Sequence, residues 1–232
     1  MTAPRPAPGA EVLAAALGVL ARHAGALPAV TVTWARSAAG AIAAADHRPL
    51  ALSGPQSMEM THRLRAAHQA ILVGISTVIA DDPLLSVRLL PGTPPQPQPV
   101  VLDSRLRFPL QARLLARTDR KPWIFSRGEP SERRSALEQR GARLFTAAAG
   151  PGGVDLYAVL RALGEHGVRS VMVEGGARVL RAFLAAGFAD QVIVTTSPVA
   201  VQGLRGPDLP AFVLSFTEQV GADTVTWGLP NA

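Results

Sequence analysis

Two stretches of this chain, about a hundred residues apart, share one order: an apolar run, a glycine turn and then a helical pattern. Val73–Arg88 reads VGISTVIADDPLLSVR, and Val168–Gly187 reads VRSVMVEGGARVLRAFLAAG. Open α/β sheets bind ligands beyond the carboxyl ends of their strands, where such turns lie. The two junctions therefore restrict the chain to an α/β fold and favour a nucleotide held between them.

The remaining apolar runs alternate with helical patterns through most of the chain. Strands are predicted at 29–35, 70–74, 99–104, 121–126, 142–147, 190–198, 211–219 and 222–229. Helices are predicted within 54–69, from Ser76 or Thr77 to Asp81, and over 156–167. No helix separates the last two strands. We therefore expect a mostly parallel sheet flanked by helices, with an antiparallel hairpin at its C-terminal edge.

Local signals set the expected ends of these elements. Ser53 is the predicted N-cap of the helix that contains Pro55 in its first turn. The Asp81-Asp82-Pro83 corner ends the short helix. The proline-rich segment Pro91–Pro99 is predicted to be a surface loop that joins no helix or inner strand.

Composition limits the class of protein. A length of 232 residues, 48% of them hydrophobic, allows one large core, so we expect a main domain at 28–232 with a helical extension at 1–27. The absence of cysteine excludes disulfides, thiolate catalysis and Cys-ligated zinc, and it fits a reducing cytoplasm.

The formal charge of +6 comes almost wholly from scattered arginines, with Lys121 the single lysine. Aromatic residues make up 5% of the chain and no dense basic run occurs, so we expect no nucleic-acid partner. The apolar run Val12–Ala21 is too short to span a bilayer, and Glu11 precedes it. We expect it to be an amphipathic packing helix and expect no membrane contact.

Glycines and a carboxylate mark the second junction. Gly175 and Gly176 precede a helix, whose first N–H groups suit a pyrophosphate, although a tight turn without a ligand is about equally common. Glu174 ends its strand, where a carboxylate can accept hydrogen bonds from an amino-pyrimidine or a sugar diol. A surface carboxylate stabilised by the helix dipole is the alternative, and the sequence weighs the two evenly.

At the first junction, one of Asp81 and Asp82 is predicted to cap the helix while the other faces the cleft. Arg65 and Arg88 flank this corner and could converge on one phosphate, although ordinary solvated arginines would look the same. No further ligand lies at metal spacing, so no metal site is predicted. No histidine is assigned a catalytic role, and the three tryptophans are expected in the core.

Taken together, these residues resemble the pyrimidine reductase family of riboflavin biosynthesis, over roughly residues 30–227. The resemblance rests on motifs in a fixed order: HRLRA (62–66), the ILVG…TV.ADDP.L.VR array (71–88), VVLDS (100–104), VEGG (173–176), and LAAGFADQVIV followed by Ser197-Pro198. It implies a dihydrofolate-reductase-like fold, NADPH as hydride donor, and a phosphoribosylamino-pyrimidine that is reduced to its ribitylamino form.

The resemblance also implies residue roles. Cofactor contacts are expected from Ala35, Ser37, Thr77, Asp81, Ser104, Gly176, Ala177, Arg178, Val179, Leu180, Arg181 and Ala182, with Arg178 the candidate for a 2′-phosphate. Substrate contacts are expected from Arg65, Leu85, Arg88 and Glu174. Asp81 is the candidate for proton transfer. A homodimer is implied, and deamination would be supplied by a separate chain.

The chain departs from the family's pattern near its start. A Lys-x-Ala-x-Ser-x-Asp-Gly motif is usual, but Thr33 stands in place of the lysine and Ala39 in place of the aspartate. Pro49 and Ala51 lie near positions that commonly hold a serine and a tryptophan. Two rivals follow: a reductase of the same fold with another pterin or pyrimidine substrate, and a catalytically silent homologue that binds nucleotide.

Overall fold

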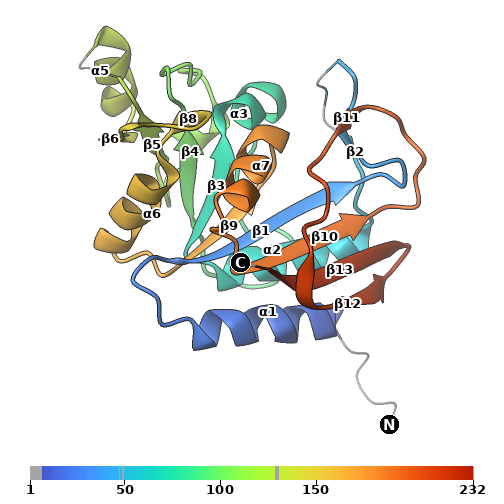
Figure 1. The fold of residues 1–232 in the computed structure, drawn as a ribbon. Helices are drawn as coiled ribbons and strands as arrows, with labels where there is room; N and C mark the ends of the chain where they lie inside the picture. The colour runs from blue at the N-terminus through green and yellow to red at the C-terminus, as the bar shows by residue number, and fades with distance from the viewer. Residues whose placement is uncertain (1–6, 47, 49, 129–130, 232) are drawn as a thin grey trace.

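In a computed structural model, residues 7–46, 48, 50–128 and 131–231 are described. One nine-stranded sheet runs through the protein (Figure 1). Its spatial order is β12 (Phe212–Val220), β13 (Asp223–Pro230), β10 (Gln191–Thr196), β1 (Ala29–Arg36), β9 (Ser170–Glu174), β3 (Ala70–Gly74), β4 (Gln98–Leu102), β5 (Trp123–Ser126) and β6 (Arg143–Thr146).

The strands from β10 to β6 are parallel to one another, and β12 and β13 join them as an antiparallel pair. Short apolar runs joined by helical crossovers produce this arrangement, because parallel neighbours need long connections. The predicted fold class, a mostly parallel sheet with an antiparallel C-terminal hairpin, is confirmed.

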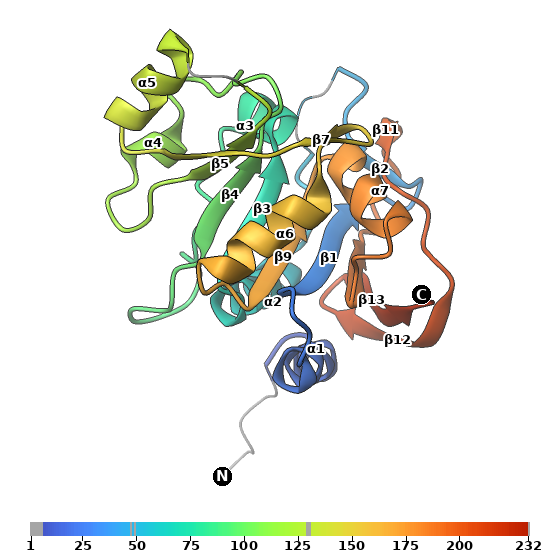
Figure 2. The same cartoon turned by 60° about the vertical axis from the view of Figure 1, so that its left-hand side comes forward.

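Helices cover both faces of the sheet, and Figure 2 shows α6 and α7 together on one of them. The helices are α1 (Ala10–Arg22), α2 (Pro55–Ala67), α3 (Ile75–Asp81), α4 (Arg113–Ala116), α5 (Glu132–Gln139), α6 (Leu156–Glu165) and α7 (Ala177–Ala185). The core consists of two apolar clusters. Buried apolar residues of α1 to α5 belong to one cluster, and those of α6 and α7 belong to the other; both clusters include residues of the sheet.

Two small sheets flank the main one. β2 (Ala41–Ala43) pairs with β11 (Leu204–Arg205), and β7 (Ala149–Gly150) pairs with β8 (Gly153–Val154).

The N-terminal helix α1 packs onto the core of the sheet. Val12 and Ala16 are fully buried in the cluster that also holds Met60. The backbone N–H of Val12 donates to Glu218 Oε2 at 2.9 Å, so β12 supplies the acceptor for the start of α1. The predicted amphipathic packing helix is confirmed.

A buried hydrogen-bond chain ties the middle of the sheet to α2. His68 Nδ1 lies 2.7 Å from the Leu64 carbonyl, which fixes Nε2 as the acceptor from Thr31 Oγ1 at 2.7 Å. Gln191 donates to Thr31 Oγ1 at 2.8 Å and accepts from Trp227 Nε1 at 2.8 Å. Every donor in this chain meets an acceptor, so the network orients α2 on the sheet without an unpaired buried group.

Three local predictions were wrong. Pro99 was predicted both to end the proline-rich loop and to begin the strand 99–104; the strand is confirmed and the loop assignment of Pro99 is wrong. Pro99 lies inside β4, between β3 and β5, because its missing N–H faces the β5 side before pairing with β5 begins at Val100. Ser53 does not cap α2; Gly54 occupies the N-cap position without a side-chain bond, and Pro55 follows it. α3 begins at Ile75, directly after the strand.

Candidate functional site

The main cavity, of about 1500 Å³, lies at the carboxyl ends of β1, β9, β3 and β4. The parallel pairing brings these strand ends to one edge of the sheet, as expected for a doubly covered α/β fold. The β2–β11 sheet and the β7–β8 hairpin add walls to the cavity. Both glycine junctions identified in the sequence open into it.

The second junction is a glycine turn packed against α3. Gly175 and Gly176 have φ values of 74° and 71°, a conformation that side chains disfavour. A Cβ on Gly176 would lie 3.1 Å from Thr77 Oγ1, so the turn of one junction touches the helix of the other. No side chain caps the N-terminus of α7, which leaves its first backbone N–H groups without a side-chain acceptor at the wall of the cavity.

An ion pair forms the floor of the cavity. Arg65 of α2 donates to both oxygens of Glu174 at 2.7 and 2.6 Å, and the two side chains are only 12% and 15% exposed. Glu174 raises the pKa of Arg65 above its ordinary value, although burial alone would lower it. Glu174 pairs with Thr33 in the register of β1 and β9, and Thr33 carries no charge. The cation that pairs with Glu174 therefore comes from Arg65 of α2.

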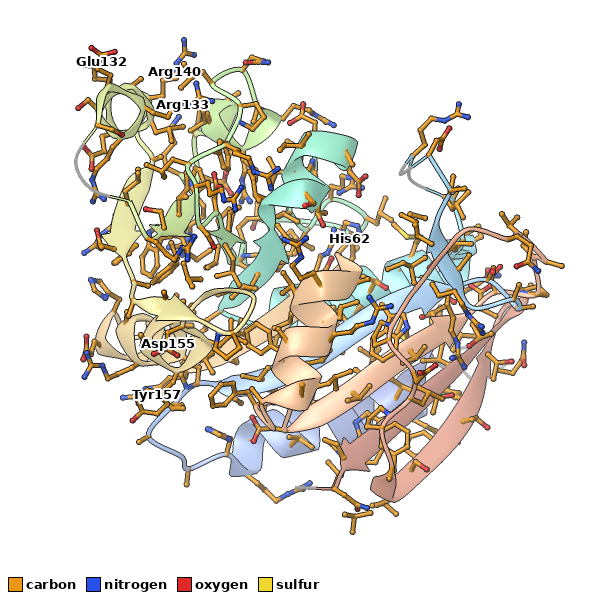
Figure 3. All side chains as sticks on the ribbon, turned by 45° about the horizontal axis from the view of Figure 1, so that its top comes forward. His62, Glu132, Arg133, Arg140, Asp155 and Tyr157 are labelled. Atoms are coloured by element: carbon orange, nitrogen blue, oxygen red, sulfur yellow. The ribbon has the colours of Figure 1, made fainter. Side chains whose placement is uncertain are left out.

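Arg88 lies close to this pair but does not line the cavity. Partial burial and then the charge of Arg65 lower the pKa of Arg88. Its backbone N–H donates to Nδ1 of His62 at 3.0 Å, which assigns the His62 proton to Nε2 (Figure 3 marks this residue). Burial, with the charges of Arg65 and Arg88, lowers the pKa of His62 to about 4, so the ring is neutral near pH 7.

The two aspartates at the first junction separate. Asp82 ends α3 in a left-handed conformation with φ of 38°, and its Oδ1 accepts from the Arg113 N–H at 2.8 Å. Asp81 lines the cavity, and partial burial raises its pKa. The split into one residue at the helix end and one facing the cleft is as expected.

Most residues named from the sequence line the cavity. They are Ala35, Arg65, Thr77, Asp81, Leu85, Ser104, Glu174, Gly176, Ala177, Arg178, Val179, Arg181 and Ala182.

Ser37, Leu180 and Arg88 do not line the cavity. Ser37 is buried and donates to the Val201 carbonyl at 2.7 Å, which holds the loop before β2. Leu180 is fully buried in the cluster under α7, because it lies on the helix face toward the sheet. The site proposed below therefore does not use the side chains of Ser37 and Leu180.

Other lining residues were not identified from the sequence. Trp34 was expected in the core, and it is 5% exposed there, yet it also forms part of the cavity wall. Arg105, Arg107, Arg127 and Arg205 were passed over among the scattered arginines. Arg127 directly follows β5 and Arg105 lies in the loop after β4, and these positions beyond strand ends were the available signal.

The cavity is strongly positive. Seven arginines line it, against three carboxylates. The arginines are Arg65, Arg105, Arg107, Arg127, Arg178, Arg181 and Arg205, and the carboxylates are Asp81, Asp103 and Glu174. This excess favours a ligand with several phosphate groups.

Within the described ranges, no group of three or more His, Asp or Glu residues is placed to hold a metal ion. None of the helices described is long and apolar enough to cross a membrane.

Comparison with known proteins gives a family. The model of the RibD C-terminal domain matches residues 28–212. A 2,5-diamino-6-ribosylamino-4(3H)-pyrimidinone 5′-phosphate reductase of Archaeoglobus fulgidus is 35% identical over 189 residues, covering 78% of this chain and 84% of that protein. The riboflavin biosynthesis protein RibD of Aquifex aeolicus is 34% identical over 183 residues, covering 78% of this chain and 50% of that protein. The chain thus spans about half the length of this RibD relative.

Solved structures agree on the fold. RibD of Acinetobacter baumannii gives a TM-score of 0.76 at 27% identity, covering 89% of this chain and 59% of that chain. A Saccharomyces riboflavin biosynthesis reductase gives 0.73 at 22% identity, covering 94% and 97%. The predicted dihydrofolate-reductase-like architecture is confirmed.

Proposed function

This chain belongs to the RibD C-terminal domain family, and we propose on that basis that it reduces a phosphorylated pyrimidine glycoside with NADPH. The substrate would be 5-amino-6-(5-phosphoribosylamino)uracil or the related diaminopyrimidinone, and its ribosyl group would become ribityl. The observation that carries the proposal is one cavity that joins the Gly175–Gly176 turn to the Arg65–Glu174 pair. These features suit, respectively, a dinucleotide and an amino-pyrimidine.

The cofactor site is proposed along the two glycine junctions. The uncapped start of α7 would receive the pyrophosphate, because its free N–H groups and dipole favour an anion. Thr77 lies against Gly176 and would contact the same group, and Ser104 would contact the adenosine half. NADPH, when bound, would supply a hydride to C1′ of the ring-opened ribose, present as an imine.

The substrate site is proposed on the α2 side. Each Glu174 oxygen uses one lone pair on Arg65 and retains another for the pyrimidine, so the ion pair would orient the carboxylate for recognition. Leu85 would close the pocket beside it. We assign the phosphate to Arg65 and Arg88, because burial and then the charge of Arg65 lower the pKa of Arg88, and a phosphate dianion would offset the repulsion between the two cations.

Reduction of the imine also needs a proton on its nitrogen. Asp81 is the proposed donor, since it lines the cavity and its raised pKa lets it retain a proton to higher pH than an ordinary aspartate. Thr33 and Ala39, which replace a lysine and an aspartate of the usual pattern, carry no ionisable group. Of the two other noted departures, Pro49 lies outside the described residues and Ala51 is exposed.

We further propose a cytoplasmic homodimer in which residues 28–232 form the reductase and 1–27 an added helix. Deamination would be performed outside these 232 residues, because the sequence lacks the cysteines that a zinc deaminase uses.

The test is a mixture of purified protein, NADPH and the phosphoribosylaminouracil, followed through the nicotinamide absorbance. The proposal expects oxidation of NADPH that depends on the pyrimidine. Oxidation with dihydrofolate alone would favour the rival substrate class. Tight NADPH binding without turnover on either compound would favour a silent homologue, which the loss of ionisable groups at Thr33 and Ala39 keeps as the second candidate.

A further inference from the structure

The segment Leu84–Arg88 is irregular backbone between α3 and the proline-rich segment Pro91–Pro99. Leu85 lines the cavity although its φ of 47° is left-handed, a conformation that is unfavourable for residues with a side chain. In the part of the chain that the structure describes, no backbone–backbone hydrogen bond involves residues 84–88. Contacts other than regular secondary structure must therefore hold Leu85 at the cavity wall.

Arg117 holds the first two carbonyl groups of this segment. One of its nitrogens donates to the carbonyl oxygens of Leu84 and Leu85 at 3.0 and 2.9 Å. The side chain of Arg117 is only 5% exposed, and its other donors bind the carboxylate of Asp119, which fixes the orientation of the guanidinium. Because this fixed donor holds the Leu85 carbonyl from outside the segment, the surroundings maintain the unfavourable φ of Leu85.

The short helix α4 anchors Arg117, which directly follows it. Leu114 and Leu115 of this helix are 0% and 6% exposed and belong to the apolar core. At the start of α4, the Arg113 N–H donates to Asp82 Oδ1 at 2.8 Å. Both ends of α4 therefore hold the chain that leads from α3 to the cavity wall.

Gln96, in the proline-rich segment, pairs with Val87 as a neighbouring strand would. Its Oε1 accepts the Val87 N–H and its Nε2 donates to the Val87 carbonyl, both at 2.9 Å. A side-chain amide offers the same donor and acceptor as a backbone unit, whereas an apolar side chain would leave both groups of Val87 without a partner. The proline-rich segment does not line the cavity, yet it holds the residue that precedes Arg88.

Helix α2 links the same segment to the ion pair on the cavity floor. Besides its two bonds to Glu174, Arg65 donates to the Ser86 carbonyl at 3.3 Å. His62, one turn earlier on α2, accepts the Arg88 N–H at 3.0 Å. A group that binds the Arg65–Glu174 pair therefore meets a wall whose backbone is bonded to the same arginine.

We propose that Gln96 and Arg117 are positioning residues for the pyrimidine substrate. They hold the segment that places Leu85 against the pyrimidine ring and Arg88 beside the phosphate. The proposal rests on the function proposed above and extends its substrate side to two residues outside the cavity lining. A wall that is ordered before binding loses less conformational entropy when the substrate arrives. Because neither residue lines the cavity, the affinity for NADPH should not depend on them.

Gln96→Met keeps the length of the side chain and removes both of its bonds to Val87. It is expected to raise KM for the phosphoribosylaminouracil about tenfold, with kcat and the Kd for NADPH changed by no more than about twofold. Gln98→Met is the matched control, because Gln98 also donates to backbone carbonyls, but at the start of β4, the end remote from the cavity. This control should lower the free energy of unfolding in urea and leave KM unchanged.

Arg117→Met tests the second support and should likewise raise KM for the pyrimidine about tenfold without weakening NADPH. Arg134→Met is its control, because Arg134 also donates to a strand carbonyl, that of Leu144 at 3.1 Å, and does not line the cavity. The control should leave KM unchanged. If Arg117→Met does not fold, Gln96→Met still decides the proposal, since Gln96 is partly exposed and uncharged.

Amide hydrogen exchange, measured by mass spectrometry, tests the support of the segment without substrate. A peptide that contains residues 84–90 should exchange faster in Gln96→Met than in the native protein, because the Val87 N–H loses its acceptor. The same peptide should be unaffected in Gln98→Met.

Four results would each overturn the positioning role and leave the proposed function intact. They are an unchanged KM in Gln96→Met, an equal rise of KM in Gln98→Met, equal weakening of pyrimidine and NADPH, and unchanged exchange of residues 84–90. A native protein that oxidises no NADPH with the pyrimidine would overturn the proposed function, and the positioning role with it.

Discussion

The Arg65–Glu174 pair gives the sharpest prediction on stability. Its two N–H···O bonds of 2.7 and 2.6 Å are charge-assisted and mostly shielded from water. Arg65→Met keeps the length of the side chain and removes the charge, which leaves the carboxylate of Glu174 partly buried without its cation. Removing one partner of a fully buried pair costs about 3–5 kcal/mol. The residual exposure of 12% and 15% reduces this, and we expect about 2–4 kcal/mol.

The same helix provides the control. Arg63 and Glu59 also form an ion pair at 2.7 Å, but their side chains are 40% and 37% exposed. Arg63→Met is expected to cost no more than about 0.5 kcal/mol, because water screens exposed pairs. Urea unfolding with linear extrapolation gives the free energy of unfolding for each variant.

A double-mutant cycle isolates the pair itself. Arg65→Met and Glu174→Gln, alone and together, should show a coupling energy of about 2 kcal/mol, against near zero for Arg63 with Glu59. If Arg65→Met costs no more than Arg63→Met, burial does not strengthen the pair, and its role as a rigid floor of the cavity fails.

Three further predictions concern the glycine turn, the proton and a buried histidine. Gly176→Ala should weaken the affinity for NADPH at least tenfold in a fluorescence titration, because a Cβ at this position meets Thr77. Gly187→Ala is the control: its φ of 67° strains the backbone to a similar degree, but its Cβ would enter open space, so the affinity for NADPH should not change. Asp81→Asn should lower kcat about 100-fold and remove the fall in rate as pH rises through the raised pKa; an unchanged pH–rate profile would exclude Asp81 as the donor. Burial keeps His62 neutral in the folded protein, whereas the unfolded chain takes up a proton on this residue at a pKa of 6.5. The free energy of unfolding should therefore drop by on the order of 3 kcal/mol as pH falls from 6.5 to about 4. His62→Gln should flatten that part of the curve measured by urea unfolding.

Local patterns in the sequence predict most of the fold. The apolar run at 70–74 matches β3 residue for residue, because a short β-branched stretch bounded by glycine has few other stable conformations. Pro99 was assigned to the surface loop as well as to the strand 99–104, because the rule against proline in inner strands depends on which neighbour its backbone faces. That direction follows from strand order, which no local pattern contains.

The site was predictable where it depends on strand ends and unpredictable where it depends on distant pairing. Glu174 ends β9, and Thr77 and Asp81 lie on the short helix that follows β3; the parallel sheet brings these positions to one edge. The bond between Arg65 and Glu174 joins residues 109 positions apart, and the sequence showed only two separate charges. Ser37 and Leu180 adjoin site residues but face the loop and the core, because neighbouring residues in a chain point in different directions.

Deuterium transfer shows whether the ribosyl group is the site of reduction. The protein is incubated with NADPH deuterated at the transferable C4 position and with the phosphoribosylaminouracil, and the product is examined by mass spectrometry and NMR. We expect a ribitylamino product with one deuterium at C1′ for each NADPH oxidised. A reduced pyrimidine ring, or a ribityl product without deuterium at C1′, would contradict this expectation.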